Sequence, residues 1–317
     1  MSALIQAQHL HRYYADTHAV DDVSIQLHQG DILGLLGPNG AGKSSCMQML
    51  CGVLAPSAGE VLIKGIDLLD NPRQAKQQIG YLADTPPLYP ELTVDEYLNY
   101  AAHLRRIPKA QRPALHTQAK ERCGLENYGR RLIGNLSKGY QQRTGIAQAI
   151  IHQPDVIILD EPTIGLDPIQ MREIRNLITE LGKQHGVILS THILPEVQAV
   201  CNRVQLVHQG KSVFNKPMHD IQQHEQLRLH LQQAPDTDAL LKLPAVESID
   251  SNTDGTYILN GKNLQQNLAE ISQYCVAQNW GLLEIHLLEN SLEQVFIKLT
   301  TGEDTTHNRT KPKEPVA

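Results

Sequence analysis

Along this 317-residue chain, apolar residues follow a strand pattern in some segments and the three- to four-residue spacing of a helix in others. The changes between these patterns predict an alternation of strands and helices. Continuous apolar runs at 31–36 and 155–160 are typical of strands buried on both faces of a parallel sheet. Further strands are predicted at 60–64, 79–82, 187–191 and 204–207, and helices at 45–50, 93–104, 109–123, 136–151 and 168–184. The pattern therefore predicts an α/β fold with a mainly parallel sheet and helical crossovers.

Two segments depart from that alternation. Residues 3–30 are rich in strand signals, and apolar positions within 20–27 partly alternate with polar ones, as in a half-exposed antiparallel strand. Residues 84–150 are predicted to form a helical insertion. Its first helix opens with a capping box, in which the Thr93 hydroxyl accepts from the Glu96 amide while the Glu96 side chain reaches back. We therefore expect a mixed sheet with a helical subdomain.

The composition changes near 218–225, and a smaller α/β pattern follows. Strands are predicted there at 227–231, 246–250, 256–260 and 282–287, and helices at 236–242, 264–279 and 291–299. The order β-α-β-β-α-β, with a helix added, fits a ferredoxin-like module. We therefore predict a first domain at 1–220, a small ferredoxin-like α/β domain at 221–300 and a disordered tail at 301–317.

A glycine-rich loop joins the strand at 31–36 to the helix that follows it. It reads Gly37-Pro38-Asn39-Gly40-Ala41-Gly42-Lys43-Ser44 and fits the phosphate-binding pattern G-x-x-x-x-G-K-[ST]. Its backbone N–H groups and the start of the helix offer partial positive charge to phosphates. Lys43 is expected to reach the β- and γ-phosphates of a nucleoside triphosphate, and Ser44 to bind Mg²⁺ through its hydroxyl.

Acidic and imidazole side chains stand at the ends of two other predicted strands. Asp160 and Glu161 end the apolar run at 155–160. In P-loop enzymes an acid at such a strand end helps to hold Mg²⁺, and a second carboxylate can polarise an attacking water. His192 follows the strand at 187–191, where an imidazole either contacts a γ-phosphate or serves a structural role.

Composition and charge narrow the class of protein. The formal net charge is −6 and the pI about 6.2, which argues against a nucleic-acid partner. The five cysteines are scattered without a C-x-x-C pair, which argues against a disulfide framework or a zinc site and fits a reducing cytosol. No apolar run approaches the ~18 residues that a membrane span needs, and we expect no secretory signal at the N-terminus.

Together these motifs resemble those of ATP-binding-cassette (ABC) ATPases over residues 3–217. The family's order is kept by the P-loop, Leu136-Ser137-x-Gly139, Leu159-Asp160-Glu161-Pro162-Thr163, Gly165-Leu166-Asp167-Pro168 and Ser190-Thr191-His192. Other segments resemble the export-type branch that works with ABC-2-type membrane subunits, and most of all the gliding-motility-type ATP-binding subunits. These segments are Ile79–Leu82, Pro87–Pro90, Val187–Val197 and Ser291–Phe296.

The resemblance implies how ATP and Mg²⁺ would be bound. Tyr14 would stack on adenine, and the backbone of Gly37–Ser45 would bind the phosphates. Ser44 and Asp160 would hold the metal ion. The family usually places Gln in the loop after the strand at 79–82, where it touches Mg²⁺ and the attacking water, whereas this chain has Asp84. An ionised carboxylate can bind Mg²⁺ but cannot donate a hydrogen bond.

The resemblance also implies the catalytic groups and the partners. Glu161 would be the general base, with His192 and Lys43 at the γ-phosphate. Because the chain has no membrane span of its own, it would be a cytoplasmic protein held at the inner face of the cell membrane by separate ABC-2-type permease subunits. Their cytoplasmic helices would dock on residues 83–90 and on the helical insertion.

The family works as a head-to-tail dimer in which each ATP lies between two protomers, so the resemblance implies a second ATP-binding protomer, here a homodimer. Ser137 and Gly139 would bind the γ-phosphate of the ATP held by the opposite protomer, and Asp167 would communicate across the dimer. The usual Leu-Ser-Gly-Gly-Gln reads differently here, because Lys138 and Tyr140 replace a glycine and the glutamine. Binding in trans is expected to survive these changes.

Two other classes of function are less consistent with the sequence. A soluble ABC protein of translation or DNA repair would carry two cassettes or a long coiled coil, and neither pattern is found. A small-molecule kinase with a P-loop would not need the segment at Leu136-Ser137. The small C-terminal domain is either a dimerisation or stability element or a regulatory ligand-binding domain, and the sequence does not decide between them.

Overall fold

The computed structural model describes residues 3–223, 225–233, 235–251 and 255–288. Its contacts divide the chain into two units, Met1–Asn215 and Lys216–Ala317, compared with the division at 220/221 predicted from composition. The predicted helix at 291–299, the segment Ser291–Phe296 and the tail at 301–317 lie outside the described residues.

The first unit contains the predicted parallel sheet. Its strands lie in the order β10-β9-β3-β8-β7-β6, and β3 pairs in parallel with both β8 and β9. β7 is parallel to β6 and β8 in the same way. The bounds are β3 Ile32–Leu36, β6 Ile79–Leu82, β7 Val156–Asp160, β8 Gly186–Thr191, β9 Arg203–His208 and β10 Lys211–Pro217. Every residue of β3 and β7 is buried, which confirms the reading of the two continuous apolar runs.

A second, antiparallel sheet completes the core of this unit, with strand order β2-β1-β4-β5. Its strands are β1 Ile5–Tyr14, β2 Thr17–Leu27, β4 Ala58–Ile63 and β5 Ile66–Asp67. The half-exposed antiparallel strand predicted within 20–27 is confirmed, because buried and exposed positions alternate toward the end of β2. Helix α1 (Lys43–Leu50) shares one apolar cluster with both sheets, and the buried Cys46 belongs to that cluster.

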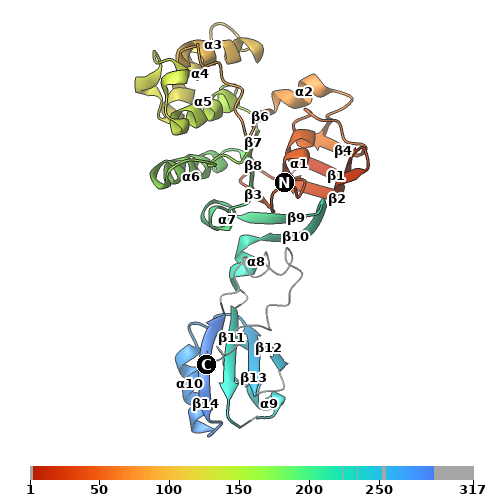
Figure 1. Cartoon of the computed structure of the whole chain (residues 1–317), viewed down its shortest axis with the longest axis vertical. Helices are drawn as coiled ribbons and strands as arrows, with labels where there is room; N and C mark the ends of the chain where they lie inside the picture. The colour runs from red at the N-terminus through yellow and green to blue at the C-terminus, as the bar shows by residue number, and fades with distance from the viewer. Residues whose placement is uncertain (1–2, 224, 234, 252–254, 289–317) are drawn as a thin grey trace, which may run out of the picture. The chain divides into compact units, whose positions relative to one another are not determined.

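Three helices form the insertion predicted between 84 and 150. They are α3 (Val94–Leu104), α4 (Arg112–Cys123) and α5 (Lys138–Ile150), and they pack on one another in a group that Figure 1 shows beside the sheets. Short 3₁₀ turns at Glu126–Tyr128 and Ile133–Asn135 connect α4 to α5. The capping box is confirmed, since the Thr93 hydroxyl accepts from the Glu96 amide and the Glu96 carboxylate accepts from the Thr93 amide.

The remaining helices of the first unit are α2 (Pro72–Gln77), α6 (Pro168–Gly182) and α7 (Leu194–Val200). The prediction for 168–184 is confirmed with an end two residues earlier. α2 and α7 were missed because both are short and each carries only one or two turns of apolar spacing.

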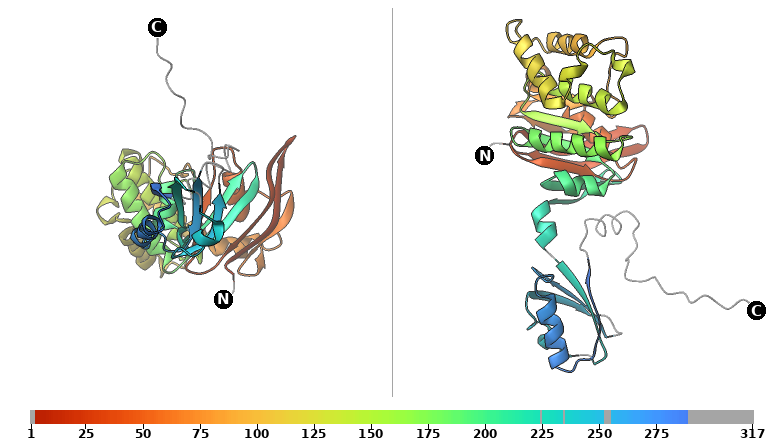
Figure 2. Two further views of the ribbon diagram at one scale, coloured as in Figure 1. Left: turned by 90° about the horizontal axis from the view of Figure 1, so that it is seen from below. Right: turned by 90° about the vertical axis from the view of Figure 1, so that its left-hand side faces the viewer.

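The second unit is a four-stranded antiparallel sheet in the order β12-β13-β11-β14. Its elements are α8 Met218–Gln223, β11 Glu225–Leu231, α9 Thr237–Leu240, β12 Val246–Ser251, β13 Thr256–Gly261, α10 Leu268–Ala277 and β14 Leu282–Leu288. From β11 onward the predicted order β-α-β-β-α-β is confirmed, although both helices are shorter than predicted. Figure 2 shows α10 along one face of this sheet, where Ile271 and Cys275 join its apolar core.

Candidate functional site

The glycine-rich loop leaves β3 and enters α1, as the sequence predicts. Gly42 has a φ of +103°, and a Cβ at that position would lie 2.4 Å from the carbonyl oxygen of Ala19. At Gly37 a Cβ would lie 2.3 Å from the carbonyl oxygen of Val207. Both positions therefore require glycine, because any side chain would force the loop away from β2 and β9.

Lys43, the first residue of α1, points back into this loop. Its side chain is only 6% exposed, and Nζ donates to the carbonyl oxygens of Gly37 at 2.8 Å and Pro38 at 3.1 Å. Nζ also lies 3.7 Å from Oε1 of Glu161. Burial lowers the pKa of Lys43, and the charges of Glu161 and Asp160 act in the opposite direction. The ammonium group is thus held in place before any anion arrives.

Asp160 is the last residue of β7, and its carboxylate lies beside Ser44 of α1. Its Oδ1 atom accepts hydrogen bonds from the Ser44 hydroxyl at 3.4 Å and from the Ser190 hydroxyl. Burial raises the pKa of Asp160, the two serine hydroxyls lower it, and the nearby charge of Asp84 raises it further. Two oxygen-donor side chains, Ser44 and Asp160, therefore meet at one point, and oxygen is the ligand that Mg²⁺ prefers.

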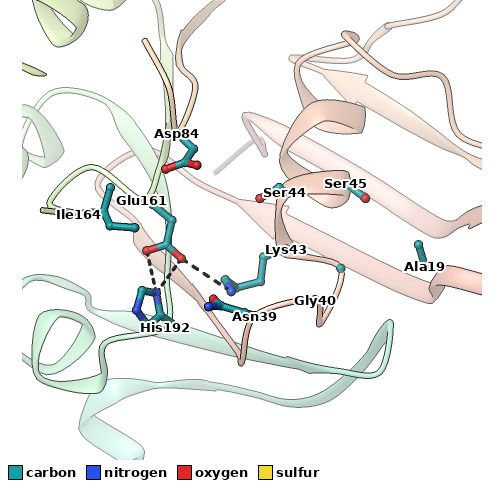
Figure 3. Close-up of a pocket in the computed structure, with 11 residues that line it drawn as sticks. Ala19, Asn39, Gly40, Lys43, Ser44, Ser45, Asp84, Glu161, Ile164 and His192 are labelled. Carbon is teal, nitrogen blue, oxygen red and sulfur yellow. Dashed lines mark hydrogen bonds and ion pairs between the residues drawn. The ribbon is translucent and has the colours of Figure 1, made fainter.

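Glu161 adopts a backbone conformation that is rare outside glycine, with a φ of +46°. Such a conformation costs roughly 1–2 kcal/mol and is common at functional sites. Here it is stabilised by the amide of Glu161, which donates to the backbone oxygen of Ser190 at 3.2 Å and to its hydroxyl at 3.0 Å. The turn directs the Glu161 carboxylate toward Lys43 rather than along the strand (Figure 3).

The Glu161 carboxylate is held by the imidazole of His192. Nδ1 of His192 lies 3.1 Å from Oε1 and 3.1 Å from Oε2 of Glu161. Because an ionised carboxylate can only accept hydrogen bonds, Nδ1 carries the proton in this arrangement. Figure 3 shows Glu161 between His192 and Lys43, with interactions to both.

Lys43, Ser44, Glu161 and His192 border a cavity of about 400 Å³, whose lining does not include the buried Asp160. The cavity is lined by Ala19, Asn39, Gly40, Gly42, Lys43, Ser44, Ser45, Asp84, Glu161, Ile164 and His192 (Figure 3). Of the other predicted site residues, Gly37 and Pro38 contact Lys43, and Ala41 is buried in the loop. The cavity is within the size range of small-molecule sites.

Four residues named from the sequence lie away from the cavity lining. Tyr14 is 42% exposed, with the Arg12 guanidinium 4.8 Å from its ring centroid. Ser137 begins α5 without a capping bond from its side chain, and Gly139 packs so closely on α6 that a Cβ would lie 2.6 Å from Gln170. Asp167 caps α6 by accepting from the amides of residues 169 and 170. A single chain does not bring these four to Lys43.

A buried carboxylate behind the site was missed by the sequence reasoning. Glu196, on α7, is 3% exposed and accepts from the Thr191 hydroxyl at 2.8 Å and from the Thr163 hydroxyl. Arg175 lies 3.7 Å from the same carboxylate. Glu196 thus connects the segment after Glu161 to the end of β8, which carries His192.

Ser190 was quoted as part of a motif but given no role. It pairs in register with Asp160 across β7 and β8, and its hydroxyl contacts both acidic residues of the site. The only signal in the sequence was its place near the end of an apolar strand, and that signal does not reveal which neighbouring strand it faces.

Comparisons with known proteins agree on one family. The family model described as ABC transporter matches residues 20–164. The bacitracin transport ATP-binding protein BcrA of Bacillus licheniformis is 33% identical over 307 residues, which cover 95% of this chain and 99% of that protein. A solved ATP-binding subunit of an ABC transporter superposes with a TM-score of 0.63 and 30% identity, over 69% of this chain and 92% of that one. The dimeric cassette MJ0796, solved with ADP and phosphate, shares the fold, with a TM-score of 0.62 and 22% identity over 68% of this chain and 98% of that one.

Proposed function

The chain belongs to the ABC transporter family, as an ATP-binding subunit that hydrolyses ATP to ADP and phosphate, and we propose that it drives export through separate membrane subunits. The relatives carry the export proposal. The observation that carries the mechanism of hydrolysis is the position of the Glu161 carboxylate, which His192 orients at 3.1 Å and Lys43 approaches at 3.7 Å beside the phosphate-binding loop. A general base must be held in one orientation to accept a proton from water, and these contacts supply that orientation.

In the proposed mechanism the triphosphate lies in the 400 Å³ cavity against the amides of the glycine-rich loop. Lys43 then exchanges its bonds to the Gly37 and Pro38 carbonyls for the β- and γ-phosphates. Glu161 accepts the proton of the attacking water, and His192, at the cavity wall, keeps the carboxylate aimed at that water. Each part of this arrangement acts by position and charge, as phosphoryl transfer requires.

The oxygen donors of Ser44 and Asp160 fit Mg²⁺, and we propose that they hold it. Mg²⁺ bound with the nucleotide would neutralise charge that develops on the phosphates. Asp84 lines the same cavity and is the third proposed ligand. Ser190 positions Asp160 through its hydroxyl, so that Oδ1 is oriented before the ion arrives.

We further propose that two protomers complete each other's sites. The start of α5 is free to take a phosphate, because Ser137 makes no side-chain cap and the first turn carries no acidic residue. Gly139 packs the start of α5 against α6, and Asp167 caps α6. The two segments proposed to contact the opposite protomer, the start of α5 and Asp167, therefore lie close together. The solved cassette MJ0796 is a dimer, which supports the same assembly for this chain.

The membrane partners are proposed to be ABC-2-type permease subunits, with the chain at the cytoplasmic face of the membrane. Within the described part of the chain, no helix combines the length and apolarity that a membrane span needs. An aromatic surface in the helical insertion fits a docking site, because Tyr89 and Tyr100 are each more than 40% exposed and meet edge to face at 5.6 Å. Relatives such as BcrA are transport proteins, which favours an export-type assembly, and the gliding-motility type stays our finer proposal.

The second unit is proposed to be a ferredoxin-like domain, on the basis of its element order and the strand order β12-β13-β11-β14. Two alternative roles are proposed for it: a dimerisation or stability element, and a regulatory ligand-binding domain. Deleting residues from 216 onward separates the two: loss of the ATP-dependent dimer or a lower free energy of unfolding would indicate a dimerisation or stability element, and no change in either would indicate a regulatory domain.

The test of the proposed function uses the full chain with its membrane partners. Phosphate release from ATP should require Mg²⁺ and should increase when permease subunits encoded beside this chain are coexpressed and copurified from membranes. Lys43→Ala should weaken nucleotide binding at least about tenfold, because it removes the cation that contacts two phosphates. Recovery of the chain free of membranes with every candidate partner present would count against export. Transfer of phosphate to a metabolite in place of phosphate release would indicate a kinase.

A further inference from the structure

Three metal-ligating side chains meet on the β1–β2 hairpin, outside the lining of the nucleotide cavity. His11 lies on β1, and His18 and Asp21 lie on β2. Nδ1 of His11 is 3.2 Å from Nε2 of His18 and 3.5 Å from Oδ1 of Asp21. One ligand atom from each residue lies within 4.8 Å of the other two. We propose that His11, His18 and Asp21 bind one divalent transition-metal ion of the zinc class.

Two of the three separations between these atoms fit a tetrahedral ion. Ligands bound to Zn²⁺ at about 2.0–2.1 Å lie about 3.3–3.4 Å from one another in that geometry. The separations of 3.2 Å and 3.5 Å from His11 Nδ1 lie on either side of this value. The ligand atoms of His18 and Asp21 lie within 4.8 Å of each other, and the 3.6 Å contact between these two residues is through Nδ1 of His18 rather than Nε2. Without metal, the two imidazoles can share only one proton between those nitrogens, and the ion would replace that proton with a bond to each ring.

Neighbouring residues hold the three ligands in place. The ring of Tyr13 stacks on His18 at a centroid distance of 4.1 Å and an angle of 16°, which restricts rotation of the imidazole. The Lys211 ammonium contacts Oδ2 of Asp21 at 3.2 Å, which leaves Oδ1 toward the histidines. The Asp21 amide donates to the Gly210 carbonyl at 2.8 Å. Such second contacts hold the ligands in one orientation.

The chemistry of the donors selects the class of ion. Two imidazole nitrogens and one carboxylate oxygen suit Zn²⁺ and its neighbours, whereas Mg²⁺ and Ca²⁺ take oxygen ligands. The three side chains are 25–29% exposed, so a water molecule can reach the ion and complete four-coordination. The site therefore differs in donor set from the Ser44 and Asp160 pair.

The position of the cluster connects it to the nucleotide cavity. Ala19 lies between His18 and Asp21 in the chain and lines that cavity, and its carbonyl oxygen abuts Gly42 of the phosphate-binding loop. An ion on the hairpin would fix this segment of β2. The proposal itself needs no nucleotide, so it stands or falls independently of the proposed function.

The test is a titration of the metal-stripped full chain with Zn²⁺ alone, without nucleotide, in competition with a chromophoric chelator. The wild type should bind one tight equivalent, and His11→Ala and His18→Ala should weaken that equivalent at least about tenfold. His9→Ala is the matched control, because His9 is an exposed histidine on the same strand that pairs with Asp22 instead. Lys43→Ala should also bind Zn²⁺ as the wild type does.

A second variant keeps the test decisive if an alanine substitution unfolds the hairpin. Asp21→Asn preserves size and should weaken Zn²⁺ at least about tenfold while circular dichroism stays unchanged. Co²⁺ should give the intense visible bands of a tetrahedral site in the wild type and His9→Ala but not in Asp21→Asn. Absence of a tight equivalent in the wild type, or equal losses in His9→Ala and His18→Ala, would overturn the proposal.

Discussion

His192 Nδ1 lies 3.1 Å from both carboxylate oxygens of Glu161, and this pairing connects the ends of β7 and β8. The sequence reasoning assigned His192 to the γ-phosphate, and the structure adds a contact with the carboxylate. A symmetric contact to both oxygens restricts rotation of the carboxylate. The left-handed backbone at Glu161 fixes the same side chain from the other end. Glu161 is thereby oriented before ATP and water arrive.

Replacing the proposed base should separate binding from turnover. Glu161→Gln keeps the size of the side chain and can still interact with His192, but its amide cannot accept a proton from water at neutral pH. We expect ATP affinity to stay within about threefold and phosphate release to fall by about 10²–10⁴-fold. Size-exclusion chromatography with ATP should show a stable dimer. Near-normal phosphate release would remove Glu161 from the role of base.

The role of His192 can be read from a double-mutant cycle. If His192 acts by orienting Glu161, His192→Ala should lower turnover by about tenfold or more in the wild type and have little further effect in the Glu161→Gln background. If it acts instead on the γ-phosphate, the two losses should multiply. The measurement is the single-turnover rate at saturating ATP, because KM would mix binding with chemistry.

The ionised carboxylate of Asp160 should lower the free energy of unfolding as long as no ion is bound to it. Burial raises its folded pKa above the unfolded value, so ionisation disfavours the folded state. This loss of stability is absent below the pKa of the unfolded state and grows as the pH rises toward the pKa of the folded state. Above the folded pKa it reaches its full size. Asp160→Asn should therefore raise the free energy of unfolding at pH 7 without Mg²⁺, while Mg²⁺-dependent ATP hydrolysis is lost.

Urea unfolding at pH 7 and at pH 3 measures this difference. The gain in Asp160→Asn should shrink at the lower pH, where the wild-type carboxyl is protonated in both states. Asp70→Asn serves as the control, because Asp70 is exposed and should change stability little at either pH. A loss of stability at pH 7 in Asp160→Asn would show that the charge is already compensated by Ser44 and Ser190.

The sequence predicted best what depends on local pattern. The buried runs of β3 and β7, the Thr93 capping box and the loop entering α1 all follow from residues adjacent in the chain. The sequence predicted least about contacts between residues that only the pairing of two strands brings together. Ser190 faces Asp160 only because β7 and β8 are neighbours in register.

The metal-ligating cluster of His11, His18 and Asp21 was not predicted for the same reason. The spacing of the cysteines gave no reason to expect a zinc site, yet His11 and His18 come together because β1 and β2 pair, with Tyr13 opposite His18. Likewise, Glu196 becomes a central buried acceptor only once α7 packs beneath β8. These residues carry no motif, so only the pairing of elements reveals them.

Asp84 stands where the family usually has Gln, and its charge is the basis of the last prediction. It lines the cavity, and its negative charge raises the pKa of Asp160, so the two carboxylates share one electrostatic environment. A cation between them would be attracted by both. Asp84→Gln, which restores the residue usual in the family, should raise the Mg²⁺ concentration for half-maximal ATP hydrolysis by about tenfold and preserve turnover at saturating Mg²⁺.

Asp84→Ala should raise the Mg²⁺ requirement equally and also lower the maximal rate, because it removes every polar atom that could orient water. Glu91→Gln is the matched control, since Glu91 is an exposed acid in the same segment that does not line the cavity. Titrations of phosphate release with Mg²⁺ at fixed ATP distinguish the variants. An unchanged Mg²⁺ requirement in both Asp84 variants would show that Asp84 is not a ligand, and that Ser44 and Asp160 hold the ion without it.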